Sequence, residues 1–433
     1  MSVHGDHFYK FLSDLSFVRV SGTEEEHRAA NMIMEEIKSY GLEPKLEPFE
    51  VSHRKPVNAK FVVTSPEVKE YTVTGLINAG DTPVGGTDAE FYYMESINPF
   101  SLQKGKGKFV LLNARPSEEE YKQLMEVGIA GFLWLNGTAR DTYENSDLDT
   151  MRYRATYHRY GEVPAFAIRM IDAMDLVRSN PKTVHFELQH EEWKGTSYNV
   201  VTVVPGTDKA DEAICVGGHY DSVEFSKGSW DNGAGTVQVL GLLQHLAKNP
   251  PRRTVKAVCF GSEEIGLNGS KAYLAAHPED RDNLLCMINL DVGGSALGSY
   301  MAGITATAEA EHYLTHLLRE CGWWIDARSG VMSSDCAVFS DWGIPSISLG
   351  RMTPSPYGGF MHTRYDNMDM ISADVLGEEI DILIAVATHL LSAEIFPIQR
   401  KISDEMTKEI VKYFGTGNSH TWEVQNPDKV EKK

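Results

Sequence analysis

Five side chains in the second half of the sequence are of types that bind metal ions, and each lies at or just after the end of a short apolar run. An open α/β sheet binds its ligands in the crevice beyond the carboxyl ends of its strands, where such side chains would meet. Two imidazoles and three carboxylates provide a nitrogen and oxygen donor set that suits a pair of zinc ions in a hydrolase. The five candidates are His219, Asp231, Glu264, Asp291 and His362.

The acidic candidates differ in the chemistry that their surroundings favour. Asp231 is central in the set and opens the segment DNGAG, so we expect its carboxylate to bridge both ions. Glu263 and Glu264 are adjacent carboxylates after an apolar run, and they would repel each other unless a cation lay between them. One of the two could bind metal while its neighbour acts as a general base.

Asp221 is a candidate support for His219. The two residues lie two positions apart in an expected strand, so their side chains leave the same face of that strand. Asp221 could therefore accept the second ring N–H of His219 and fix its tautomer. Taken singly, these residues also have ordinary explanations, such as a helix cap or a solvated loop. Their joint occurrence at consecutive strand ends favours the metal site.

Strands that alternate with helices from about residue 191 onward indicate an α/β fold with a mostly parallel sheet covered on both faces. Apolar periodicity and stop signals predict long helices in this part of the chain, and the polar tail predicts a surface helix with a frayed end. The expected helices cover 237–251, 307–322 and 372–396, and the tail begins at Pro397.

An earlier helix is predicted over residues 21–41, with Thr23 as its N-cap and Glu26 closing a capping box. From about residue 56 to 190 the pattern changes to short strands broken by Gly, Pro and Asn. We interpret this stretch as a β-rich domain inserted into another, so that 1–55 and 191–433 form one domain and 56–190 the second. The inserted domain would cover the site or contribute to a homodimer contact.

The composition excludes several classes of partner. The 61 acidic and 41 basic side chains give a formal charge of -20, which disfavours binding to nucleic acid and to anionic membranes. The N-terminus has no apolar core of signal-peptide length, and no apolar stretch reaches the roughly 18 residues needed to cross a bilayer. The five cysteines show no CxxC spacing, so neither disulfides nor a cysteine–zinc site is indicated. We therefore expect a cytoplasmic protein.

Several segments of the catalytic half resemble the co-catalytic zinc exopeptidases of metallopeptidase family 28, which include leucyl aminopeptidases and glutamate carboxypeptidases. The resemblance implies a three-layer zinc exopeptidase fold, with two zinc ions as cofactors and Co2+ or Mn2+ as alternatives. Parts of 56–190 resemble the protease-associated domain that these enzymes often carry. The segments are GGHYDSV (217–223), DNGAG (231–235), GSEEIGLNGS (261–270), NLDVGG (289–294), SDCAVFSDWGIPSISL (334–349) and MHTRYDNMD (361–369).

The resemblance also assigns the roles of the candidate residues. It implies one zinc site of His219, Asp231 and Asp291, and a second of Asp231, Glu264 and His362. Glu263 would be the general base, assisted by Asp221 behind His219. The sequence departs from the family pattern at Cys336, where a histidine is common, and at Met361, where a glutamate carboxypeptidase would have tyrosine.

These observations favour an aminopeptidase that hydrolyses terminal peptide bonds. An acid-rich cleft attracts the α-ammonium group of a peptide more than its carboxylate. A carboxypeptidase or a small amide hydrolase on the same scaffold is the alternative, and Arg351 could then pair with a substrate carboxylate. A catalytically inactive binding protein would be expected to lose ligands or the base, and all are present. A serine hydrolase is disfavoured because no GxSxG motif occurs.

Overall fold

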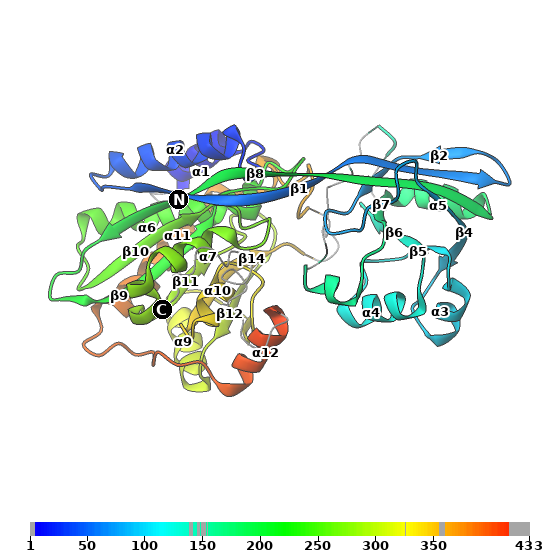
Figure 1. The fold of residues 1–433 in the computed structure, drawn as a ribbon. Coiled ribbons are helices and arrows are strands. Elements are labelled where there is room, and N and C mark those ends of the chain that lie inside the picture. Colours follow the sequence, from blue (N-terminus) through cyan, green and yellow to red (C-terminus); the bar gives the residue numbers. More distant parts are fainter. Residues whose placement is uncertain are drawn as a thin grey trace. The chain divides into compact units, whose positions relative to one another are not determined.

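The computed structural model of the chain separates into two compact units. It describes residues 5–414, except for 138–141, 145–147, 149–152, 154, 325 and 355–359. The main unit contains Met1–Val51 and Gly195–Lys433, and the inserted unit contains Ser52–Lys194. The chain passes between them within two long strands, β1 (Lys45–Ser65) and β8 (Thr183–Val204), which Figure 1 labels. The inserted unit was predicted to cover residues 56–190. The observed unit begins four residues earlier, at Ser52, and ends four residues later, at Lys194.

The sheet of the main unit has the strand order β13-β12-β14-β11-β9-β10-β8 among the described residues. Adjacent strands from β14 through β10 are parallel, as are β12 and β13. The pairs β12–β14 and β10–β8 are antiparallel, so the sheet is mostly parallel. Besides β8, its strands are β9 (Lys209–His219), β10 (Arg253–Phe260), β11 (Met287–Leu290), β12 (Ser299–Thr305), β13 (Asp326–Ser329) and β14 (Ser346–Met352).

Helices pack on both faces of this sheet because successive strand residues point in opposite directions. Ile214 and Val216 of β9 share a core with α1, α2, α6, α9 and α11, whereas Cys215 packs in a second core with α7, α10 and α12 (Figure 1). The result is a mixed α/β fold with a central sheet between helices. Its helices are α1 (Gly5–Leu15), α2 (Glu24–Ser39), α6 (Ala234–Lys248), α7 (Asn268–Ala276), α8 (Pro278–Asn283), α9 (Ala308–Glu320), α10 (Cys336–Asp341), α11 (Ala373–Ser392) and α12 (Asp404–Phe414), with short helical turns η2 (Ser229–Gly233) and η4 (Met368–Met370).

Most predicted helices are present, with small shifts at their ends. The helix predicted over 237–251 is α6, those over 307–322 and 372–396 are α9 and α11, and the tail contributes α12. The frayed end predicted for the tail lies outside the described residues. Among the described residues, every helix is too short or too polar to cross a membrane.

The N-terminus of α2 differs from the prediction in one respect. Thr23 is the N-cap, and its side-chain oxygen accepts a hydrogen bond from the Glu26 N–H at 3.2 Å. The predicted capping box is wrong, because the Glu26 carboxylate does not return to Thr23. It accepts a hydrogen bond from the Gly22 N–H at 2.6 Å and another from the Ser197 hydroxyl at 2.7 Å. Glu26 is therefore a buried residue that links α2 to β8.

The inserted unit contains a second sheet and its own apolar core. Its strands β4 through β7 are parallel neighbours, while β3 and β8 pair antiparallel with β7 and β4. Among the described residues of this unit, three α-helices accompany the strands, and they were not predicted from the sequence. The elements are β2 (Lys69–Tyr71), β3 (Val73–Gly75), β4 (Thr87–Met94), α3 (Pro99–Gly105), β5 (Phe109–Leu112), α4 (Glu118–Val127), β6 (Gly131–Asn136), η1 (Ala155–Tyr160), β7 (Ala165–Arg169) and α5 (Met170–Arg178).

We expect an excised fragment of residues 52–194 to fold by itself. Phe109, Phe132, Phe166 and Phe186 are fully buried in a core that belongs to this unit alone, which is the property of an independent domain. The fragment should show a cooperative thermal transition by circular dichroism. Phe109→Ala should lower the free energy of unfolding by about 3–5 kcal/mol, the usual cost of removing a buried phenylalanine. A fragment without a cooperative transition would contradict this prediction.

Candidate metal centre

The strand register brings the predicted ligands to one edge of the main-unit sheet. In the parallel pair β9–β10, His219 at the end of β9 lies beside Phe260 at the end of β10. In the pair β9–β11, Gly217 lies beside Asn289, so Asp291 just after β11 is level with His219. Because these strands are parallel, the residues that follow them meet at the carboxyl edge of the sheet.

The five predicted ligands form two groups that share Asp231. One group is His219, Asp231 and Asp291, the other is Asp231, Glu264 and His362, and in each group the ligand atoms lie within 4.8 Å of one another. Each group offers one imidazole nitrogen and two carboxylates, a donor set that fits zinc.

The two oxygens of Asp231 face different histidines. The Oδ1 atom lies 3.2 Å from His219 Nε2, and the Oδ2 atom lies 3.4 Å from His362 Nε2. The outer carboxylates complete each group, with His219 Nε2 3.7 Å from Asp291 Oδ1 and His362 Nε2 3.1 Å from Glu264 Oε2. A carboxylate placed in this way can serve two cations at once.

Asp221 contacts both sides of the cluster. Its Oδ1 atom lies 3.3 Å from His219 Nδ1, the ring nitrogen that faces away from Asp231. Its two oxygens also accept hydrogen bonds from the backbone N–H groups of Glu263 and Glu264, at 3.0 and 3.2 Å. Asp221 is fully buried. It therefore orients a histidine and, at the same time, the segment that carries the paired glutamates, a second contact that the sequence did not predict.

Glu263 also lies at the cluster. One of its carboxylate oxygens forms a third group with His219 and Glu264, within the same 4.8 Å limit. Burial raises the pKa of Glu263 well above its usual value, although the charge of His219 opposes this shift. A carboxylate in such surroundings takes up a proton readily. Its position suits either a metal ligand or a proton acceptor beside the metal.

The electrostatics of the cluster favour bound positive charge. Burial alone would raise the pKa of Asp231, but its contacts with His219 and His362 outweigh burial and lower it. The neighbouring Glu264 charge raises the pKa of His362 to about 12, against the opposing effect of burial. Burial raises the pKa of Glu264 despite its contact with His362. Carboxylates thus surround both imidazoles, which is the environment that a cation would stabilise.

Two buried residues that support the cluster were not singled out in the sequence. Asp366 is fully buried and accepts hydrogen bonds from the N–H groups of Trp230 and Asp231, at 2.7 and 3.0 Å. Arg19 is also fully buried and donates to five backbone carbonyls, those of Leu15, Phe17, Tyr220, Lys227 and Gly228. Both residues hold the loop that leads from β9 to Asp231.

Arg351, the predicted substrate-binding residue, lies on β14 and makes contacts outside the two metal groups. Its Nε atom donates to the Ser295 carbonyl at 2.8 Å, and its guanidinium lies 4.7 Å from the centre of the Tyr300 ring. Its backbone carbonyl accepts a hydrogen bond from the Trp230 indole at 2.8 Å. A role in substrate binding stays a prediction.

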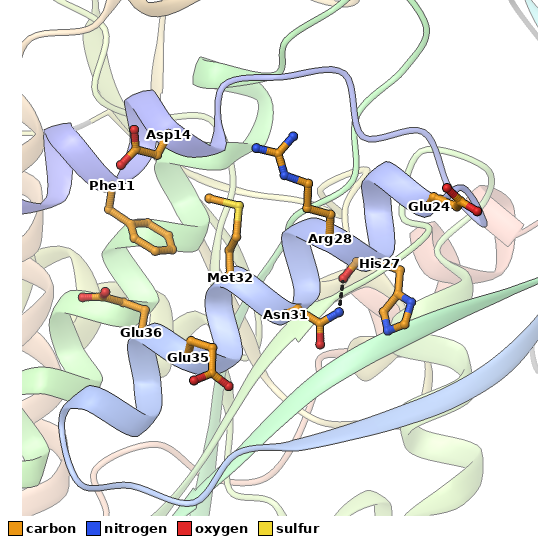
Figure 2. Close-up of a pocket in the computed structure, with 9 residues that line it drawn as sticks. All are labelled: Phe11, Asp14, Glu24, His27, Arg28, Asn31, Met32, Glu35 and Glu36. Carbon is orange, nitrogen blue, oxygen red and sulfur yellow. Dashed lines mark hydrogen bonds between the residues drawn. The ribbon is translucent and has the colours of Figure 1, made fainter.

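A separate surface hollow lies on α1 and α2 (Figure 2). Its volume is about 830 Å³, and none of the five predicted ligands lines it. Figure 2 shows Phe11 and Met32 between the charged side chains that surround the hollow. Its residues are Phe11, Asp14, Glu24, His27, Arg28, Asn31, Met32, Glu35 and Glu36.

The α/β fold and the histidine–carboxylate cluster at the carboxyl edge of its sheet define a metal-dependent hydrolase. Residues 199–387 match the sequence profile of peptidase family M28. This segment is similar to peptidase family M28, and the likeness supports a metallopeptidase. The matched residues include all five predicted ligands.

Individual proteins that are similar to this chain are peptidases by name. Aminopeptidase YwaD of Bacillus subtilis is 24% identical over 414 residues, which cover 90% of this chain and 85% of that protein. Carboxypeptidase Q of Bos taurus is 24% identical over 64% of this chain, and the match spans 61% of that relative's length. The solved structure of BSAP, a zinc aminopeptidase from Bacillus subtilis, has a TM-score of 0.73 and 21% identity, and covers 93% of this chain and 98% of that chain. The structural likeness supports the mixed α/β fold.

Proposed function

We propose that the chain is a dinuclear zinc exopeptidase that acts as an aminopeptidase. One observation carries the proposal: the two carboxylate oxygens of Asp231 face the imidazoles of His219 and His362, each within 3.4 Å. His219, Asp231 and Asp291 would hold one ion, and Asp231, Glu264 and His362 the other. When bound, a pair of zinc ions would acidify a water molecule and polarise the scissile carbonyl.

The protein side chains would do the rest of the chemistry. Glu263 would accept the proton of the attacking water and return it to the amine that leaves. Asp221 would keep His219 in one tautomer and hold the backbone of Glu263 in place. Burial raises the pKa of Glu263 above its ordinary value, which is the direction that favours a proton acceptor.

The acid-rich cluster favours binding of a substrate's α-ammonium group. Glu263 lies beside the two metal groups, and each group itself contains two carboxylates, so an anionic substrate end would meet like charges. The similarity to aminopeptidase YwaD agrees with this assignment, and the similarity to carboxypeptidase Q makes a carboxypeptidase the second candidate. A small amide hydrolase is a further alternative on the same scaffold. An inactive binding protein is disfavoured because the ligands and Glu263 are all present.

Three further expectations stay predictions. The inserted unit would be a protease-associated domain that restricts access to chain ends. The expected partners are the peptide substrate and a second copy of the chain in a homodimer. The location is expected to be the cytoplasm.

We expect an acetylated peptide N-terminus to abolish cleavage, whereas C-terminal amidation should have little effect. The reason is that acetylation removes the positive charge that the acidic cluster would bind. The measurement is a comparison of kcat/KM for the free, acetylated and amidated forms of one peptide, with the released residue identified by mass spectrometry. Release of the last residue from the acetylated peptide, and loss of that activity in Arg351→Ala, would instead establish a carboxypeptidase.

A further inference from the structure

Buried carboxylates from two other elements hold three consecutive backbone N–H groups at the start of the glutamate pair. The Ser262 N–H donates to Glu26 Oε1 at 3.1 Å. The next two N–H groups, of Glu263 and Glu264, donate to the two oxygens of Asp221. The segment is therefore held by Asp221, two residues after the end of β9, and by Glu26 of α2.

Glu26 is built into this position and is not a surface acid. Three adjacent glutamates begin α2, and Glu24 and Glu25 are exposed whereas Glu26 is fully buried. Glu24 lines the surface hollow of Figure 2 on the other side of the helix. Helical spacing accounts for the difference, because residues one and two positions apart leave a helix in different directions.

Four hydrogen-bond donors converge on the Glu26 carboxylate. Its Oε1 atom accepts from the Ser197 hydroxyl, the Ser262 N–H and the Ser262 hydroxyl, at 2.7, 3.1 and 3.3 Å. Its Oε2 atom accepts from the Gly22 N–H at 2.6 Å. A buried carboxylate with four donors has its acceptor sites occupied, so it holds its neighbours in one arrangement.

Ser262 has a backbone conformation that needs such support. Its φ of 56° lies in the left-handed region, which residues other than glycine rarely adopt. This conformation turns the chain from the end of β10 toward Glu263. Both polar groups of Ser262, its N–H and its hydroxyl, contact Glu26. Strained residues of this kind persist where the surroundings determine their conformation.

We infer that Glu26 is a positioning residue for Glu263, acting through the backbone of Ser262. The inference rests on the proposed function, in which Glu263 is the general base. Glu26 lies outside residues 199–387, which match the family profile, so this part of the site comes from the N-terminal segment. Glu263 directly follows Ser262, whereas Glu264 is one residue further along, so loss of Glu26 should disturb the base before it disturbs the metal ligand.

The test is Glu26→Gln in the full chain loaded with zinc. The amide can keep three of the four hydrogen bonds, but its NH2 group must then face the Gly22 N–H, so the hydrogen bond with Gly22 is lost. We expect kcat to fall by about ten- to a hundredfold, the scale of a slightly misplaced catalytic group. KM and zinc content should stay at the unmodified level. Glu26→Asp, which keeps a carboxyl group with two acceptor oxygens, should recover part of the lost kcat and serves as the second variant if Glu26→Gln does not fold.

Glu36→Gln is the matched control. Glu36 lies on the same helix, and its carboxylate forms hydrogen bonds with His7 and with Tyr40, each at 2.7 Å. The substitution therefore also removes a hydrogen-bonded carboxylate from α2. The control should keep the unmodified kcat even if its melting temperature falls. If Glu26→Gln behaves like Glu36→Gln, with lower melting temperature and unchanged kcat, Glu26 only stabilises the fold and the inference is overturned.

A double variant separates this inference from the proposed function. If Glu26 acts through Glu263, adding Glu26→Gln to Glu263→Gln should cause no further loss of kcat. A further loss as large as that of Glu26→Gln alone would mean that Glu26 acts independently, which contradicts the inference. If Glu263→Gln alone keeps full activity, the role proposed for Glu263 fails first.

Discussion

Glu263→Gln should reduce kcat by a factor on the order of 10² or more, while the protein stays folded and keeps its zinc. The amide keeps the size of the side chain but cannot accept the proton of the attacking water. Glu263 lies with His219 and Glu264 at the cluster but belongs to neither group that shares Asp231, so its carboxylate is the proton acceptor that the variant removes. Steady-state kinetics and elemental analysis of the same preparation would measure both quantities.

Glu264→Gln is the companion variant, because it removes a carboxylate from the adjacent position. Its Oε2 atom lies 3.1 Å from His362 Nε2, so we expect this substitution to weaken metal binding in the group of His362. Titration with zinc would then show reduced affinity. Equal zinc content and equal loss of kcat in the two variants would contradict the division of roles between base and ligand.

Asp231→Asn should remove metal from both groups and abolish activity. An amide offers one oxygen and no charge, so it cannot bridge two cations as a carboxylate does. We expect the unmodified protein to contain about two zinc ions per chain and the variant to retain less than one, by elemental analysis. A chelator should inactivate the unmodified protein, and added zinc should restore it. No more than one ion in the unmodified protein at saturation would contradict the dinuclear proposal.

Asp280→Asn is a suitable control for the loss of metal. Asp280 is a buried carboxylate of the same unit, and with His277 and Glu279 it forms another group whose atoms lie within 4.8 Å. Its oxygens are already engaged by Lys256 and Tyr273, at 3.1 and 2.5 Å. Zinc content should therefore be unchanged in Asp280→Asn. A fall in zinc content would indicate that part of the bound metal lies at this second group.

The sequence predicted the ligand groups because their signal is local. His219 and Asp291 follow apolar strands, and a charge at the end of such a strand stands out from its neighbours. Parallel pairing then brings all these strand ends to the same edge, whatever the exact register of each strand. Glu264 follows β10 in the same way, whereas Asp231 lies in the turn η2 before α6 and His362 joins from a loop.

The supporting residues could not be found in the same way, because their contacts join distant parts of the chain. Arg19 donates to the carbonyl of Tyr220, and the two residues are 201 positions apart. Asp366 accepts a hydrogen bond from the Asp231 N–H, and these two residues are 135 positions apart in the sequence. Glu26 was predicted to close a capping box, since the local pattern fits, but its tertiary contact with Ser197 prevails. Neither helix propensity nor motif spacing contains information about such partners.

The helices of the inserted unit were missed for a different reason. The acidic segment at residues 117–121 is typical of a solvent-exposed surface. In the structure, Ser117 and Glu120 form a reciprocal capping box at the start of α4. Gly128 ends this helix in the left-handed conformation, and Tyr121 and Leu124 are its buried residues. The pattern of Ser, Glu three residues later and a final Gly was present in the sequence and would have predicted this helix.

The insertion of one unit into the other also sets the order in which the site can form during synthesis. Arg19 and Glu26 leave the ribosome early, but Ser262, the partner of Glu26, lies 236 residues later in the chain. At about 5–20 residues per second, α2 waits roughly 12 to 47 seconds for the segment that it supports. During this time the inserted unit, whose core is its own, can fold first. The N-terminal and C-terminal parts of the main unit then pack together, and the cluster of predicted ligands is complete only after this late step.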